Sequence, residues 1–287
     1  MKNKLNGHHI FDGRTVVIAT MHEKEKVIAP LLEKNLSANC FAVSGLNTDK
    51  FGTFSGEIER KKSPLQTARV KALAALELCD ETLVVASEGS FGSHPSSIFV
   101  PANEEMVILI DTKLDLEIVG RHLTVKTNYN HRSIASMKDL EGFKTDIGYP
   151  EHGIILRATD ANHNETIHKD FSSQNDLDST VRTALRNELS LKAETDMRAN
   201  QNPTRMLAIE QAVVDLVKNI NSLCPECDTP GFVVQEVVAG LPCEQCERPT
   251  KSVKAYIHQC QKCEYLLERV KEGVPFEEAM YCDFCNP

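Results

Sequence analysis

The placement of the cysteines constrains this chain more than any other feature. Eight of the ten lie in four CxxC pairs close to the C-terminus. A CxxC turn supplies two thiolates, and two such turns complete a tetrahedral metal site. We therefore predict two four-cysteine zinc sites, with an iron–sulfur cluster or a redox dithiol as the alternatives. The cysteines are Cys224, Cys227, Cys243, Cys246, Cys260, Cys263, Cys282 and Cys285.

The spacing leaves the assignment of pairs to metal ions open. Fifteen residues, including a β-like segment over residues 231–238, separate the first two pairs as in a zinc ribbon. Sequential pairing is therefore the simplest arrangement. A cross-braced arrangement, in which the first and third pairs share an ion, fits the spacing as well. In either case thiolates fill all four positions, so we expect the zinc ions to be structural and not catalytic.

Charge argues against nucleic acid as the partner. The net charge is −9, and residues 221–287 carry six Lys or Arg against eleven Asp or Glu. Each zinc ion with four thiolates would add two negative charges to this module, which disfavours contact with phosphate backbones. In the alternative, non-enzymatic interpretation, the zinc module would bind a protein partner. No apolar run approaches the roughly 20 residues of a membrane span, and the N-terminal residues lack a secretory signal, so we expect a cytoplasmic protein.

The stretch from residue 63 to residue 92 predicts a helix, a buried strand and a glycine-rich turn. Ser63 to Gln66 has the residues of a capping box, and the apolar, β-branched run Leu83–Ala86 indicates a central strand. Residues 87–92 would form the turn at the carboxyl end of that strand, where ligands bind in open α/β sheets. Glu88 is then a candidate metal ligand and Ser90 a candidate phosphate contact. A solvated turn is the alternative.

The N-terminal region predicts a β-α-β unit, with strands over residues 14–20 and 40–43 and a helix ending near Leu36. The turn after the first strand carries Thr20, His22 and Lys24, which suit phosphate oxygens. The alternative is an ordinary polar turn without a ligand, because any strand-to-helix turn is polar and the chain has no Walker motif.

The remaining pattern predicts a mixed α/β sheet sandwiched by helices, followed by a helical segment and a C-terminal double zinc-ribbon-like module. The domains would span residues 1–160, 161–220 and 221–287. Between two helices lies a charged segment that contains Arg198 and Arg205. It could close over the ligand edge of the sheet or form a capped turn with a local Asp–Arg pair. Further strands are expected over residues 106–111, 116–127 and 153–157, and helices over residues 136–144, 177–197 and 206–220.

Several motifs carry a resemblance to known families. SEGSFGSHP, ETDMRANQNPTRM and the terminal YCDFCNP resemble a bacterial family known only as a domain of unknown function. More distantly, residues 14–130 resemble the inosine/xanthosine triphosphatases and the Maf-like nucleotide pyrophosphatases. Thr67, Ala68, Lys71 and Ala72 match the helix of those enzymes, and Glu88 to Ser90 match their acidic turn. The chain departs from them at His22, where Asn is usual, and at Lys24, because their lysine falls one residue later.

The second resemblance implies a metal-dependent hydrolase of a nucleotide-like phosphoanhydride. Glu88, with Glu57 or Asp49, would hold Mg²⁺ or Mn²⁺. Lys71 and Arg69 would act with Glu88 in catalysis. The phosphates would be bound by Thr20, His22, Lys24, Ser90 and Arg198. The alternative is a non-enzymatic nucleotide- or protein-binding module with structural zinc.

Overall fold

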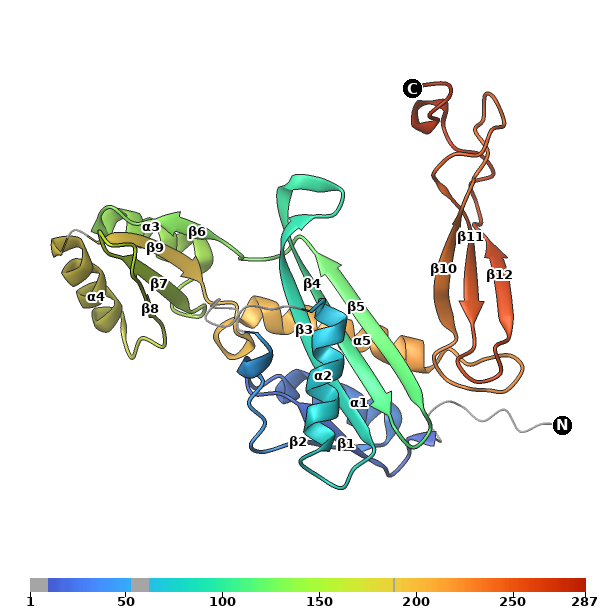
Figure 1. The fold of residues 1–287 in the computed structure, drawn as a ribbon, viewed down its shortest axis with the longest axis horizontal. Coiled ribbons are helices and arrows are strands. Elements are labelled where there is room, and N and C mark those ends of the chain that lie inside the picture. The colour runs from blue at the N-terminus through green and yellow to red at the C-terminus, as the bar shows by residue number, and fades with distance from the viewer. Residues whose placement is uncertain (1–9, 53–61, 188) are drawn as a thin grey trace. The chain divides into compact units, whose positions relative to one another are not determined.

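The computed structural model describes residues 10–52, 62–187 and 189–287. The chain forms two compact units, Gly13–Leu216 and Val217–Pro287 together with Met1–Asp12. The larger unit contains two β-sheets and the smaller unit contains a third (Figure 1). None of the described helices is both long enough and apolar enough to cross a membrane.

The first sheet of the larger unit has the strand order β2-β1-β3-β4-β5. Strand β1 pairs in parallel with β2 and β3, whereas β4 and β5 are antiparallel additions, so the sheet is mixed as predicted. The β-α-β start is confirmed. The elements are β1 (Thr15–Ala19), α1 (Glu25–Leu36), β2 (Asn39–Ala42), the short helix η2 (Asp49–Phe51), α2 (Pro64–Leu76), β3 (Leu83–His94), β4 (Ser97–Asp111) and β5 (Leu116–Thr124).

Helix α2 begins where the sequence predicts. The Gln66 amide donates to the Ser63 hydroxyl (3.3 Å), and the Ser63 amide donates to the Gln66 side chain (3.1 Å), which completes the capping box. The buried hydrophobic residues of α2 are alanines, so the helix lies close to the sheet and the side chain of Lys71 can reach β3. The alanines that pack against β1, β3 and β4 are Ala68, Ala72 and Ala75.

The predicted turn over residues 87–92 is wrong, because β3 continues through these residues to His94. Strand β4 pairs with β3 from Leu83, which lies opposite Asp111, to His94, which lies opposite Ser97. Position 89 requires glycine: a Cβ there would lie 2.4 Å from Oε1 of Glu105, which is the register partner of Gly89. Glycine inside a strand often marks such a close approach. The sequence does not show which side chain makes it.

Helix α5 (Pro203–Ile220), predicted over residues 206–220, packs on the opposite face from α2. Ile108 of β4 belongs to the α2 face, so Val107 and its register partner Gly120 point the other way. A Cβ at Gly120 would lie 2.3 Å from the carbonyl oxygen of Ala212 and 2.3 Å from the amide nitrogen of Leu216. The backbone of α5 therefore lies directly on β5.

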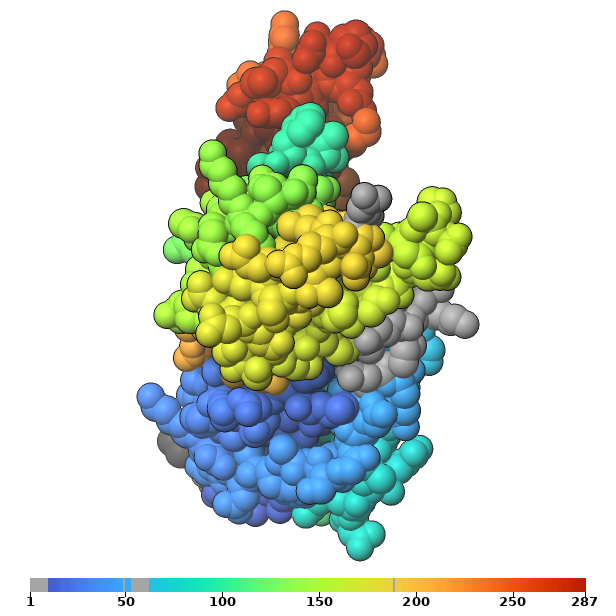
Figure 2. All heavy atoms as spheres, turned by 90° about the vertical axis from the view of Figure 1, so that its left-hand side faces the viewer, coloured from blue at the N-terminus to red at the C-terminus, as the bar shows by residue number. Residues whose placement is uncertain are grey.

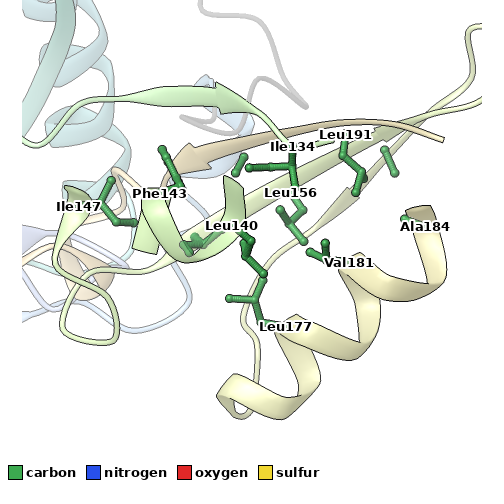
Figure 3. Packing of buried hydrophobic residues seen from close by; sticks show 12 residues of the cluster. Ile134, Leu140, Phe143, Ile147, Leu156, Leu177, Val181, Ala184 and Leu191 are labelled. Atoms are coloured by element: carbon green, nitrogen blue, oxygen red, sulfur yellow. The ribbon is translucent and has the colours of Figure 1, made fainter. Parts of the chain in front are cut away.

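The second sheet of the larger unit is antiparallel, with the order β6-β9-β7-β8. Helices α3 and α4 cover one face of it. Figure 3 shows Leu140 and Phe143 of α3 and Leu177 and Val181 of α4 packing toward Leu156 of the sheet. The elements are β6 (His131–Ser133), α3 (Met137–Ile147), β7 (Ile154–Thr159), β8 (Glu165–His168), α4 (Gln174–Arg186), β9 (Ser190–Thr195) and the short helix η3 (Ala199–Gln201).

The helix predicted over residues 177–197 is wrong beyond Arg186. Residues 190–195 form β9, whose Leu191 and Ala193 are buried and which pairs with both β6 and β7. Leucine, lysine, alanine and glutamate favour a helix in isolation, but pairing on both edges and burial outweigh that preference. Strand β8 also lies inside the segment expected to be helical, and it pairs with β7 across residue 160.

The described part of the smaller unit carries a three-stranded antiparallel sheet in the order β10-β11-β12. Its strands are β10 (Val233–Ala239), β11 (Val253–Gln259) and β12 (Leu266–Val270), and the short helix η4 (Ala279–Tyr281) follows. Strand β10 lies within the segment predicted to be β-like. The CxxC pairs lie at the two ends of this sheet.

Candidate functional site

Lys24 is buried at the carboxyl edge of β1. Its ammonium group donates to Oγ of Ser87 (3.0 Å) and to the carbonyl oxygen of Ser87 (3.3 Å), and the residue is 6% exposed. Burial, followed by the charge of Arg205, lowers the pKa of Lys24 to about 7. Within the part of the chain that the structure describes, no carboxylate forms an ion pair with Lys24. This is the least compensated cation of the site.

Lys71 and Glu88, both predicted to be catalytic, form an ion pair beside Lys24. The Lys71 Nζ lies 2.5 Å from Oε2 of Glu88, and both side chains are almost fully buried. Lys71 comes from α2 and Glu88 from β3. The charges of both act on Lys24, so the three side chains form one electrostatic cluster.

Glu105 and Arg205 extend this cluster across β4. Nε of Arg205 donates to Oε1 of Glu105 at 2.8 Å, and neither side chain is exposed. Arg205 also donates to the carbonyl oxygen of Met197. Among the described residues, Lys24, Lys71 and Arg205 are buried close to the carboxylates of Glu88 and Glu105, and the charges of these four neighbours act on Lys24. Lys24, which forms no ion pair within the described ranges, is the cation whose charge an anionic ligand would compensate.

The three residues of the first turn that were predicted to bind phosphate lie close to Lys71. They share with it a cavity of about 10 Å³, which holds about one water molecule. The lining includes Thr20, His22, Lys24, Lys71 and Ser87. A phosphate group is larger. Binding one requires these side chains to move apart, as the Lys71–Glu88 pair can do if Lys71 turns toward the anion.

Arg198, predicted to bind phosphate, is instead held by two carboxylates. Its guanidinium donates to Asp196 (2.6 Å) and to Asp170 (2.6 Å). Burial opposes the charged form of Arg198, but these hydrogen bonds outweigh it and raise the pKa. His22 acts electrostatically on Asp170. The face drawn in Figure 2 carries both the yellow-green residues around β8 and α4 and the blue residues of the β-α-β start.

The charged segment before α5 therefore contains the predicted local Asp–Arg pair. Its cap is Asn202, whose Oδ1 accepts the Arg205 amide at 2.9 Å. Asn202 is fully buried and also donates to the carbonyl oxygen of Asp196. The sequence signal for this cap was an Asn-Pro-Thr-Arg run directly before an amphipathic helix.

Arg69 points away from the cluster. Its guanidinium is paired with Glu117 of β5, with Nε 2.7 Å from the carboxylate, and both side chains are about one-third exposed. In the register of β4, Glu117 lies opposite Ile110 and Glu88 lies opposite Met106. Along the strand direction, four residues separate Glu117 from Glu88 by about 13 Å, and β4 lies between their strands. The predicted catalytic role of Arg69 has no geometric support.

Ser90 lines a second, larger cavity of about 310 Å³ between the two sheets of the larger unit. The aromatic residues Phe91 and Tyr129 line it as well. No sequence pattern singles out these two residues or Glu105, because their positions depend on strand register and on packing between elements distant in the chain.

The described residues do not form the predicted Mg²⁺ site. Glu88 is fully buried and its carboxylate is committed to the Lys71 ammonium, which a cation would have to displace. Glu57 and the side chain of Asp49, its predicted partners, lie outside the described residues. Among the described residues, the groupings able to hold a metal ion are two sets of four cysteines.

The cysteine clusters are cross-braced. The first and third CxxC pairs form one cluster, and the second and fourth form the other. Pairing of β10 with β11 explains this: Val233 lies opposite Gln259, so the turns flanking these two residues meet at one end of the sheet. Sequential pairing, the simplest prediction, is wrong. The clusters are Cys224, Cys227, Cys260 and Cys263, and Cys243, Cys246, Cys282 and Cys285.

The cluster dimensions fit zinc. Sulfur–sulfur distances of 3.6 Å (Cys224 to Cys263) and 3.7 Å (Cys246 to Cys282) approach the about 3.8 Å of a tetrahedron with Zn–S bonds of about 2.3 Å. The amide of Lys262 donates to the Cys260 sulfur, which stabilises a thiolate. His258 lies outside both clusters and packs on Phe232, with ring centroids 5.6 Å apart.

A family model for a domain of unknown function, DUF6671, matches residues 71–287. The chain belongs to this family. This confirms the first resemblance drawn from the sequence motifs. No curated protein matches the chain. The crystal structure of protein VC0702 from Vibrio cholerae is similar over 72% of this chain and 94% of that one, with 9% identity and a TM-score of 0.31, a level of likeness that carries no argument about fold or function.

Proposed function

We propose that this chain binds a nucleotide-like phosphate compound at the carboxyl edge of β1 and β3 and hydrolyses its phosphoanhydride bond. The observation that carries the proposal is the buried Lys24 ammonium, which has hydrogen bonds to Ser87 but no carboxylate partner among the described residues. A phosphate oxygen would supply the missing negative charge. The family match itself assigns no activity.

The neighbouring residues suit this role. Lys24 and Lys71 would bind phosphate oxygens from two elements, and the Thr20 hydroxyl would add a donor at the end of β1. When Lys71 turns toward the phosphate, the carboxylate of Glu88 would accept a proton from the attacking water while the water oxygen forms a bond to phosphorus. The bond from phosphorus to the leaving phosphate oxygen would break, and that oxygen would depart next to the Lys24 ammonium.

We also propose zinc as the ion of both cysteine clusters, in a structural role. Four sulfur ligands leave no open coordination position. The smaller unit would then depend on metal for folding, as small metal-binding modules do.

The test is release of phosphate and pyrophosphate from standard and deaminated nucleoside triphosphates, with and without Mg²⁺ or Mn²⁺, using the zinc-loaded chain. Lys24→Met and Glu88→Gln should reduce turnover by at least about 100-fold. Lys26→Met is the matched control, because Lys26 lies two residues away and its side chain is 63% exposed. Its turnover should stay unchanged.

Two outcomes would overturn the hydrolase proposal. Full turnover in Lys24→Met would place the chemistry elsewhere. Saturable, Lys24-dependent binding of a nucleotide with no product would indicate a non-enzymatic binding module, the alternative considered from the sequence.

A further inference from the structure

We infer that the 310 Å³ cavity beside Ser90 binds a planar heteroaromatic ring, a nucleobase, whose phosphates lie at Lys24. This inference rests on the proposed function and assigns its substrate class. The substrates would be nucleoside phosphates, and inorganic polyphosphates would lack the group that fills the cavity.

One wall of the cavity is aromatic. The rings of Phe91 and Tyr129 lie stacked, with centroids 5.8 Å apart and an interplanar angle of 30°. The guanidinium of Arg205 lies over the Phe91 ring at 5.2 Å. Phe91 therefore contacts both Arg205 and Tyr129, whereas Tyr129 remains 40% exposed. A half-exposed, supported ring that lines a cavity favours a stacked planar ligand.

The polar lining supplies both kinds of hydrogen-bonding group. The Lys192 ammonium lies 2.7 Å from Oε1 of Glu194, and both residues line the cavity with Asn130. Burial would raise the pKa of Glu194, but hydrogen bonds from Lys192 and Arg157 hold it below its usual value. Glu194 thus stays ionised at neutral pH and can accept from ring N–H or amino groups. Asn130 and Lys192 can donate to ring carbonyl groups.

The distance between the two cavities fits a nucleotide. Ser87 lines the small cavity at Lys24, and Ser90 lines the large one. Three residues of extended strand β3 place the Cα atoms of these two serines about 10 Å apart, with their side chains on opposite faces of the strand. A sugar and its first phosphates span this length, so a ligand that passes the strand from one face to the other would place its ring in one cavity and its phosphates in the other.

The chain contains no tryptophan, so Tyr129→Trp introduces a single fluorophore at the cavity. Adding nucleoside triphosphates to this zinc-loaded variant should quench its emission in a saturable manner, and inorganic tripolyphosphate should not. A second substitution, Lys24→Met, should weaken the quenching affinity at least tenfold. Phe99→Trp is the control, because Phe99 is 89% exposed near the tip of the β3–β4 hairpin. Its emission should not respond.

Turnover provides the second measurement. Tyr129→Ala should raise KM for nucleoside triphosphates about tenfold, the loss expected for one stacked base, and leave the cleavage of tripolyphosphate unchanged. Phe99→Ala should alter neither reaction.

The outcomes separate the two proposals. Equal cleavage of tripolyphosphate and nucleotides, with no quenching, would overturn the ring site and leave the phosphohydrolase intact. Saturable quenching without product would support the ring site and overturn hydrolysis. Absence of both quenching and product would overturn both proposals.

Discussion

Glu105 and Arg205 form a fully buried ion pair between residues one hundred positions apart in the chain, with Nε 2.8 Å from Oε1. Glu105 lies on β4 and Arg205 in the first turn of α5. Because Arg205 also binds the carbonyl oxygen of Met197, this pair connects the segment that follows β9 to the first sheet. The large cavity is lined by Met197, and the small cavity is lined by Lys24, on which the charges of Arg205 and Glu105 act.

Removing Arg205 should destabilise the larger unit strongly. Arg205→Met leaves the Glu105 carboxylate buried without its partner, which costs about 3–5 kcal/mol of unfolding free energy. Arg69→Met is the matched control, because the Arg69–Glu117 pair is about one-third exposed and should cost about 1 kcal/mol or less. Urea unfolding of both variants measures the difference. Equal losses would show that burial of the Glu105–Arg205 pair has no special effect.

Gly89→Ala should also be destabilising, by about 1–3 kcal/mol, because the new methyl group would lie 2.4 Å from Oε1 of Glu105 and would displace it from Arg205. Gly92→Ala is the control in the same strand, where a Cβ would have no heavy atom within 4 Å. Thermal unfolding of the two variants tests the contact. A Gly89→Ala protein as stable as Gly92→Ala would contradict it.

Cross-bracing makes opposite predictions for two double variants. Cys227→Ser with Cys263→Ser removes two ligands from one cluster, so bound zinc should fall from two ions per chain to one. Cys227→Ser with Cys246→Ser damages both clusters and should leave no tightly bound zinc. Metal analysis of the purified proteins gives the ratio. Sequential pairing would reverse the two results. Cys40→Ala, outside both clusters, should retain two ions.

The parts that followed from the sequence are those set by local chemistry. The capping box at Ser63, the β-α-β start and the individual CxxC turns depend on residues close in the chain, whereas the pairing of those turns into two clusters does not. The failures involve partners distant in sequence. Residues 87–92 form a strand because β4 lies beside them, and residues 190–195 form one because β6 and β7 do. Arg69 and Arg198 were predicted to contact phosphate or act in catalysis because their partners Glu117 and Asp170 come from segments distant in the chain; only the local Asp196–Arg198 pair could be foreseen.

Lys24 should make stability depend on pH. Burial lowers its pKa from 10.5 to about 7 in the folded chain, whereas the unfolded chain keeps the ordinary value. Between these two pH values the unfolded state binds more protons at this site, so stability rises with pH by up to about 1.4 kcal/mol per unit. Unfolding free energies of the wild type and Lys24→Met, measured from pH 7.5 to pH 9, should diverge, with the wild type gaining. The zinc thiolates titrate equally in both proteins and cancel. As the control, the unfolding free energy of Lys26→Met, which changes an exposed position, should follow the same pH dependence as the wild type. If Lys24→Met also followed the wild type, Lys24 would be charged in the folded chain, with its charge well compensated.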